Sequence, residues 1–323
     1  MKPIAALLAF PVLALATFTY PGGGLYYISE DIVGSAFYTH FNWEAISDPT
    51  HGRVNYVDQA TSIRRGLTRA SFNSFRLGAD SRTVLNATGP GRDSVRIISK
   101  KAYTNHLAIF DVRHMPQGCG TWPAIWETQG ANWPEGGEVD IVEGVNDVGP
   151  NAATLHTTEG CTMPATRRMT GTAGQNDCNW LTNFNTGCTV KMDSSLSYGP
   201  SFNENGGGWY AMERTPEYIS VWFWPRNSIT VPIEVRTNTI FPVSTKNWGI
   251  PVAFFPNTSC DITKFFGPNN IIINLTFCGD WAGNVYSQTS CPSTCVDYVN
   301  NNPGAFKGAY FDFASIRVYE PRN

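Results

Sequence analysis

The chain has 323 residues, of which 42% are hydrophobic and only 15% are charged. The formal net charge is −3, so the chain has no excess of positive charge for the phosphates of a nucleic acid, and we expect no such partner. Aromatic residues make up 13% of the chain and include ten Trp. This composition suits a neutral ligand such as a polysaccharide, because sugar faces stack on indole rings.

The first element in the chain is an apolar run over residues 4–16 that follows a lysine. The run is too short to span a bilayer and ends in small residues, so it predicts a signal peptide over residues 1–16, cleaved between there and about residue 20. A core strand or helix is the alternative, which the YPGGG sequence at 20–24 disfavours. We therefore expect a secreted, monomeric protein with a single domain over 17–323 and no membrane segment.

Short runs of apolar and β-branched residues, separated by loops rich in Gly, Pro and Asn, predict the secondary structure. In chain order, the predicted strands are Ser94–Ile98, Leu107–Val112, Glu138–Val142, Ala153–Thr157, Tyr218–Trp224, Val252–Phe255, Ile271–Phe277 and Ser315–Tyr319. No long apolar stripe repeats with a helical period. The pattern favours an all-β fold, an antiparallel β-sandwich of jelly-roll type whose concave face forms a substrate cleft.

Eight cysteines follow the predicted signal peptide, an even number that indicates disulfides in a secreted chain. They are Cys119, Cys161, Cys178, Cys188, Cys260, Cys278, Cys291 and Cys295. Zinc ligation is disfavoured because no Cys-x-x-Cys pair is present, and the pairing stays open. Glycosylation sequons occur at Asn86, Asn257 and Asn274, although Asn274 lies in an apolar run where a buried strand residue is an equally good interpretation.

The predicted strand at Glu138 carries three acidic residues, Glu138, Asp140 and Glu143. On a flat strand Glu143 would point away from the other two, because side chains alternate between faces. A β-bulge around Ile141 and Val142 would bring all three carboxyls to one face. The sequence therefore predicts a bulged strand with three acidic groups on the same side.

Two carboxyls on one face at roughly 5 to 5.5 Å suit a retaining glycosidase, in which one attacks the sugar and the other donates a proton. Like charges at this range cannot all ionise, so one carboxyl should keep its proton and act as the acid. The alternatives are an exposed acidic strand edge and a calcium loop, and the segment lacks the closer oxygen spacing and central glycine of the latter.

The segments TWPAIWE at 121–127 and GGEVDIVEG at 136–144 resemble glycoside hydrolase family 16, the laminarinase-like endo-β-1,3(4)-glucanases secreted by basidiomycete fungi. The similarity extends over nearly all of the chain after the signal peptide. It implies a jelly-roll fold, retention at the anomeric centre, Glu138 as nucleophile, Glu143 as acid/base and Asp140 as their partner. The longer, bulged spacing is typical of members that act on β-1,3 and mixed β-1,3/1,4 glucans.

The resemblance also implies a set of substrate-binding residues. They are Asn55, Arg96, Trp126, Trp133, His156 and Trp281. Each has a structural alternative, such as a core position for Trp126 or a surface ion pair for Arg96. We expect no cofactor, and although some relatives hold a structural calcium, no acidic cluster in the sequence demands a metal. We assign Trp122 to packing. Two other functions use the same scaffold: a transglycosylase with the same two glutamates, and a non-catalytic β-glucan-binding protein, which would have no use for the carboxyls.

Overall fold

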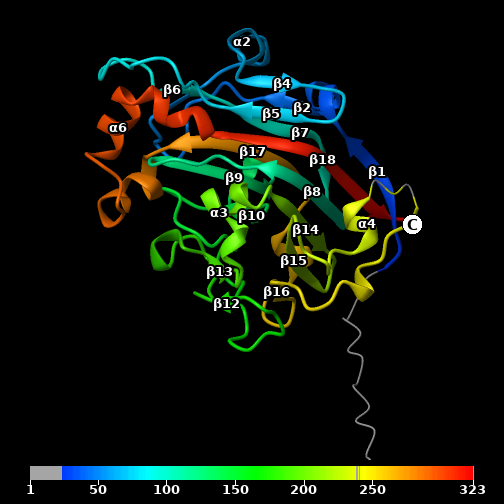
Figure 1. The fold of residues 1–323 in the computed structure, drawn as a ribbon. Coiled ribbons are helices and arrows are strands. Elements are labelled where there is room, and N and C mark those ends of the chain that lie inside the picture. The colour runs from blue at the N-terminus through cyan, green and yellow to red at the C-terminus, as the bar shows by residue number, and fades with distance from the viewer. Residues whose placement is uncertain (1–23, 238, 240, 323) are drawn as a thin grey trace, which may run out of the picture.

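Two antiparallel sheets form most of the protein. The computed structural model describes residues 24–237, 239 and 241–322, and the predicted signal peptide lies outside them. Within these residues, two sheets of eight strands each are joined by a small parallel ribbon of β3 (Val54–Tyr56) and β6 (Arg92–Ser94). Figure 1 shows the strands through the middle of the molecule and short helices around them.

The first sheet is built around the long strand β18. Across the sheet the strands are β16 (Ala253–Pro256), β15 (Tyr218–Pro225), β14 (Gly208–Arg214), β8 (His106–His114), β18 (Tyr310–Pro321), β5 (Phe75–Gly78) and β4 (Thr68–Ala70), and β1 (Tyr26–Ile32) also pairs with β18. β18 has 12 residues and pairs with β8, β5 and β1. The strand that comes after all the others in sequence therefore lies in the interior of this sheet (Figure 1).

The second sheet contains the acidic strand. Its order is β12 (Thr172–Ala173), β13 (Cys188–Lys191), β11 (Ala152–His156), β10 (Glu138–Glu143), β9 (Thr121–Thr128), β17 (Asn269–Phe277), β7 (Arg96–Tyr103) and β2 (Phe41–Trp43). β10 thus has three strands on its β11 side and four on its β9 side. Every named strand pair in this sheet is antiparallel.

The helices of the described residues are short and peripheral. They are α1 (Phe37–His40), α2 (Gln59–Arg65), α3 (Gly199–Glu204), α4 (Ile233–Arg236), α5 (Ile262–Phe265) and α6 (Cys295–Asn301). The Asp58 side chain caps α2 by accepting from the N–H of Thr61, which satisfies one of the unpaired donors at the helix start. No helix in the described part of the chain has the length and apolarity needed to cross a bilayer.

The core lies between the two sheets and is built by alternation along their strands. From the second sheet, Val139, Ile141 and Val142 of β10 are completely buried in it, and Phe110 and Met212 face them from the first sheet in the same cluster. Burying one such side chain contributes roughly 1.5 to 3 kcal/mol. The opposite face of the second sheet is therefore left free to carry polar side chains.

The predicted all-β sandwich is confirmed, and each of the eight predicted segments contains strand, although β18 begins five residues before the predicted Ser315. The predicted strand Ser94–Ile98 is wrong in one respect, because the chain changes partner at Val95 and forms β6 and then β7. Nine strands of the described residues have no counterpart among the predictions: β1, β2, β3, β4, β5, β9, β12, β13 and β14. In β9 the reason is Pro123, which disfavours a central strand.

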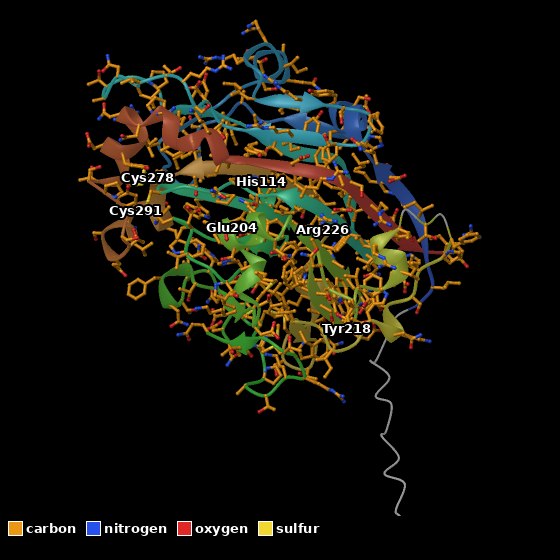
Figure 2. All side chains as sticks on the ribbon, viewed as in Figure 1. His114, Glu204, Tyr218, Arg226, Cys278 and Cys291 are labelled. Carbon is orange, nitrogen blue, oxygen red and sulfur yellow. A yellow bond between two sulfur atoms is a disulfide. The ribbon has the colours of Figure 1, made fainter. Side chains whose placement is uncertain are left out.

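All eight cysteines form disulfides, as predicted. The pairs are Cys119–Cys291, Cys161–Cys260, Cys178–Cys188 and Cys278–Cys295. Figure 2 shows Cys278 and Cys291 close together at one end of the molecule, so two of the four disulfides fasten this end. Of the three sequons, Asn86 and Asn257 are exposed, whereas Asn274 is a buried strand residue whose side chain is engaged in hydrogen bonds.

Candidate active site

The strand register shows that the three acidic residues of β10 share one face. Their partners on β9 are two residues apart in each case: Glu138 pairs with Thr128, Asp140 with Trp126 and Glu143 with Ala124. Asp140 pairs with Trp126 and Val142 with Ile125, so β10 advances by two residues while β9 advances by one. Ile141 is therefore the extra residue of a β-bulge. The predicted bulge is confirmed. We call the face that bears Glu138, Asp140 and Glu143 the carboxylate face.

Asn151, in the turn between β10 and β11, hydrogen-bonds the backbone of the bulge; we call this contact the clamp. Its Oδ1 accepts the backbone N–H of Glu143 at 2.8 Å, and its Nδ2 donates to the carbonyl of Ile141 at 2.9 Å. The side chain is completely buried, and the backbone N–H of Asn151 donates to Ser197 Oγ. One amide side chain thus satisfies a donor and an acceptor on either side of Val142 and fixes where Glu143 points.

Glu138 begins the strand and is partly exposed on the carboxylate face. The indole Nε1 of Trp133 donates to Glu138 Oε2 at 2.5 Å. Gly137, directly before it, has φ of +70°, and a Cβ added there would lie 2.5 Å from the carbonyl oxygen of Phe265. Only glycine suits this position, so the sharp entry into β10 depends on it.

Asp140 is 2% exposed and lies between the two glutamates in sequence. Burial, and then the charge and hydrogen bond of Glu138, raise the pKa of Asp140 well above its usual range. His156 lies on β11, where it pairs with Glu138. Its Nε2 is 3.4 Å from Asp140 Oδ2, and its Nδ1 is 2.9 Å from Asn185 Oδ1. Asp140 therefore favours its protonated form, in which its O–H can donate to Glu138.

Glu143 ends β10 with a carboxyl whose pKa lies far above its usual range. Burial, and then the charge of Asp140, raise the pKa of Glu143 to about 8, while a hydrogen bond from Trp122 Nε1 at 2.8 Å opposes this shift. Trp122 in turn packs edge-on against Trp281, with ring centroids 5.7 Å apart. The assignment of Trp122 to packing alone is therefore wrong, since its indole N–H donates to the Glu143 carboxyl.

The predicted binding residues on the β9 side form a chain of contacts. Trp126 Nε1 donates to Asn274 Oδ1 at 2.7 Å, and the guanidinium of Arg96 lies 5.0 Å from the Trp126 ring centroid. Arg96 also pairs with Glu44 at 2.6 Å. Since Trp126 pairs with Asp140, this row continues the carboxylate face outward.

Asn55 lies further out in the small ribbon. It is exposed, and its amide donates to Asp93 Oδ1 at 2.6 Å. Among the described residues no hydrogen bond joins it to the carboxyls or to Trp126. Its role in binding sugar therefore stays a prediction.

Glu138, Asp140 and His156 place ligand atoms within 4.8 Å of one another, so within the described residues they are the group that could hold a metal ion. Metal ligands must be deprotonated, whereas the raised pKa of Asp140 favours a proton. An ion there would also occupy the Glu138 carboxylate. The arrangement suits proton sharing better than metal binding.

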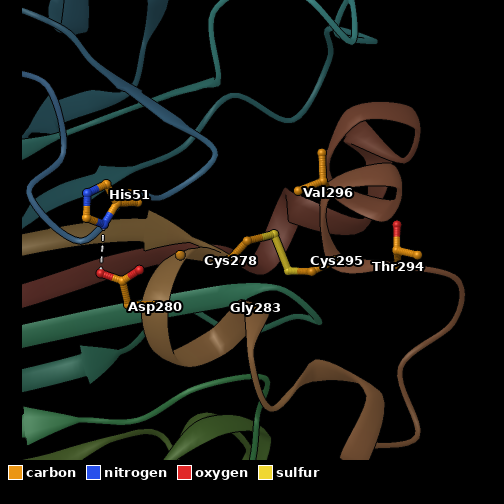
Figure 3. A pocket seen from close by; sticks show the side chains of 8 residues that line it. His51, Cys278, Asp280, Gly283, Thr294, Cys295 and Val296 are labelled. Carbon is orange, nitrogen blue, oxygen red and sulfur yellow. Dashed lines mark hydrogen bonds and ion pairs between the residues drawn. A yellow bond between two sulfur atoms is a disulfide. The ribbon is translucent and has the colours of Figure 1, made fainter. Parts of the chain in front are cut away.

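A cavity of about 410 Å³ lies away from the carboxyls, at the π-helix Gly279–Gly283. Its lining consists of His51, Cys278, Gly279, Asp280, Gly283, Thr294, Cys295 and Val296. Figure 3 shows the Cys278–Cys295 disulfide crossing between the exposed His51–Asp280 pair and Val296. No completely buried polar side chain lines it, so the carboxylate face is the better candidate site.

Several residues at the site were missed by the sequence analysis. Trp122 lies four positions before Trp126, so both face the same side of a strand, and this spacing could have identified it. Asn151 and Asn185 reach β10 and His156 from loops. Their contacts depend on how β10, β11 and β13 pair, which no local pattern reveals.

Solved structures with this architecture include two close matches. Family 16 laminarinase 16A from Phanerochaete chrysosporium, solved with 6-O-glucosyl-laminaritriose in donor and acceptor sites, is 60% identical with a TM-score of 0.91 and covers 92% of this chain and 100% of its own. An elongating family 16 β-1,3-glucosyltransferase is 39% identical with a TM-score of 0.85, over 91% of this chain and 100% of its own.

Sequence relatives give the same assignment. A probable glycosidase of Schizosaccharomyces pombe is 43% identical over 91% of this chain, and a probable endo-1,3(4)-β-glucanase of Aspergillus fumigatus is 41% identical over 91%. The chain spans 69% of the first relative's length and 45% of the second's. The family profile described as XgeA-like, catalytic GH16 domain, matches residues 41–319. With its bulged carboxylate strand and this match, the chain belongs to glycoside hydrolase family 16.

Proposed function

We propose that this protein is a retaining, endo-acting hydrolase of β-1,3 and mixed β-1,3/1,4 glucans such as laminarin. The observation that carries the proposal is the bulge, which brings Glu138, Asp140 and Glu143 to one face while Glu143 keeps a pKa of about 8. In the proposed reaction Glu138 supplies the carboxylate that attacks, and Glu143 supplies the carboxylic acid that donates a proton.

In the first step the Glu138 carboxylate attacks C1 of the sugar as Glu143 donates its proton to the glycosidic oxygen. The C1–O bond breaks, the leaving chain departs as an alcohol, and a glycosyl ester forms on Glu138. In the second step Glu143, now a carboxylate, accepts a proton from water while the water oxygen attacks C1. Glu138 is released, Glu143 is protonated again, and the anomeric configuration is retained.

The neighbouring hydrogen bonds divide these two roles. Trp133 donates to Oε2 of Glu138 and so orients the carboxylate that attacks. Asp140 keeps a proton and can donate a hydrogen bond to Glu138. The position of this proton can adjust as the charge on Glu138 is lost on ester formation and regained on hydrolysis. The Trp122 indole donates to the Glu143 side chain, but burial of the carboxyl outweighs this bond and raises the pKa of Glu143 to about 8. Glu143 therefore stays protonated until it donates its proton to the glycosidic oxygen.

Transglycosylation is the second candidate, and the similarity to the elongating β-1,3-glucosyltransferase favours it. The glycosyl ester on Glu138 would then pass to a sugar hydroxyl instead of water, with Glu143 as base for either acceptor. We further propose that the protein is secreted, since its disulfides suit an oxidising compartment, and that it acts as a monomer.

The test is digestion of laminarin and lichenan by the wild type and by Glu138→Ser. The wild type should release reducing ends and internal oligosaccharides of mixed length, whose first-formed anomer by NMR is β. Glu138→Ser should lose at least about 1,000-fold in rate. Reducing ends released by Glu138→Ser at the wild-type rate would contradict the proposal, and chain lengthening without new reducing ends would favour transglycosylation.

A further inference from the structure

A disulfide-closed loop lies at the β11 side of the carboxyls. We call residues 178–188, bounded by Cys178 and Cys188, the 178–188 loop. It begins next to Thr157, the residue after β11, because the N–H of Thr157 donates to the carbonyl of Cys178. It ends where β13 starts to pair with β11. The loop is therefore fixed beside His156 at both ends.

Two of its side chains contact residues that lie against Asp140 and Glu138. Asn185 Oδ1 lies 2.9 Å from Nδ1 of His156, whose other ring nitrogen faces Asp140. Trp180 packs against Trp133 with ring centroids 5.2 Å apart and planes at 66°, and Trp133 donates to Glu138. The loop therefore continues the carboxylate face, with one aromatic ring next to another.

The tip of the loop holds an aromatic side chain in solvent on a strained backbone. Asn183, Phe184 and Asn185 have φ values of 50°, 58° and 57°. Asparagine tolerates this left-handed region, whereas for phenylalanine it is unfavourable. Phe184 is 103% exposed and Leu181 is 71% exposed, so neither contributes to a core. The exposure and strained backbone of Phe184 mean that stability of the fold does not account for a phenylalanine at this position.

The composition of the loop indicates what covers it. Residues 178–188 read CNWLTNFNTGC and contain aromatic, amide and hydroxyl side chains but no charged one. Such a surface suits a neutral ligand that has both apolar ring faces and hydroxyls, which is the chemistry of a glucose polymer. It offers nothing to a charged partner.

We propose that the 178–188 loop is a glucan-binding element that holds the polymer beyond the sugars at the cleaved bond, with Trp180 and Phe184 as stacking platforms. This inference rests on the proposed β-glucan substrate. The loop then determines specificity for chain length: a short oligosaccharide that covers only the carboxyls does not reach Phe184, and a long chain does.

The experiment compares Phe184→Ala with Phe72→Ala. Phe72 is a matched control, because it is 92% exposed in the turn between β4 and β5 of the other sheet. For Phe184→Ala we expect KM for laminarin to rise about 3- to 10-fold, the factor of one lost aromatic contact. Its kcat, and its kcat/KM for the shortest oligosaccharide cleaved, should stay at wild-type values. Phe72→Ala should match the wild type throughout.

A second variant separates binding from folding. Phe184→Asn suits the left-handed backbone better, so its Tm should rise while laminarin binding weakens as in Phe184→Ala. Calorimetric titration of laminarin into each variant gives this binding without turnover. An unchanged KM and binding in both Phe184 variants would overturn the inference. Phe184-dependent binding by a protein that hydrolyses no glucan would support it and overturn the proposed function, and absence of laminarin binding by the wild type would overturn both.

Discussion

Single hydrogen bonds at the site separate two glutamates that the sequence makes look alike. Both are partly exposed at the ends of β10, but Glu138 accepts from Trp133 and Glu143 from Trp122, and burial of its carboxyl raises the pKa of Glu143 to about 8. In the proposed mechanism the same residue type therefore serves as nucleophile at one end of β10 and as acid at the other. The environment of each carboxyl, and not its identity, assigns the role.

The raised pKa of Glu143 predicts the alkaline limit of activity. The acid must be protonated in the free enzyme, so kcat/KM should fall about tenfold per pH unit above pH 8. The Trp122 hydrogen bond lowers the pKa of Glu143, so Trp122→Phe should move this limb to higher pH. The measurement is the pH profile of kcat/KM on laminarin for both proteins.

Trp248→Phe is the control for this measurement, because Trp248 Nε1 donates to Glu234 Oε1 at the same 2.8 Å outside the acidic strand. It should leave the alkaline limb in place. A limb that stays fixed in Trp122→Phe, or that moves to lower pH, would show that another group sets it.

Among the elements, the bulged strand shows how far the sequence can go. The spacing of Glu138, Asp140 and Glu143 requires a bulge if they are to act together, and the structure has it at Ile141. The sequence could not reveal the clamp, because Asn151 contacts Glu143 only once the turn between β10 and β11 has closed. The same holds for β9, whose proline hides it, and for every contact made by a loop.

Loss of the clamp should impair chemistry more than substrate binding. Asn151→Ala leaves the N–H of Glu143 and the carbonyl of Ile141 unpaired, at a cost of ~1–3 kcal/mol each. Glu143 would then be misplaced, so we expect kcat on laminarin to fall about 10- to 100-fold with little change in KM. An aryl glucoside with a good leaving group needs the proton less and should lose less.

Asn203→Ala is the matched control for the clamp. Asn203 bonds the N–H and the carbonyl of Met115 in the same manner, outside β10. It should lower Tm as Asn151→Ala does but keep kcat. Equal loss of kcat in the two variants would mean that Asn151 acts through stability alone.

On the scale of the whole molecule, composition and strand pattern predicted the two-sheet sandwich and the use of every cysteine in disulfides. They could not predict the pairing, since Cys119 and Cys291 are 172 residues apart and meet only in the finished fold. The same limit applies to the two sides of the site: Arg96 and Asn274 come to Trp126 from distant strands.

The four disulfides should differ in how much they stabilise the fold. In the chain-entropy description, the Cys119–Cys291 crosslink contributes ~4–5 kcal/mol and the Cys178–Cys188 crosslink, over a separation of 10, ~3 kcal/mol. The Cys119→Ser/Cys291→Ser double variant should therefore lower the urea midpoint more than Cys178→Ser/Cys188→Ser. The opposite order in equilibrium unfolding would show that local strain or structure in the unfolded chain dominates.

The position of β18 has a consequence for synthesis. A ribosome delivers β8 some 200 residues before its partner β18, so a nascent chain carries an open strand edge for most of its elongation time. The sheet that bears the carboxyls has all its strands by Phe277, whereas the sheet behind it waits for Tyr310. The edge of β8 must therefore be protected from wrong strand pairing, by a chaperone or by loops of the chain, until β18 emerges and pairs with it.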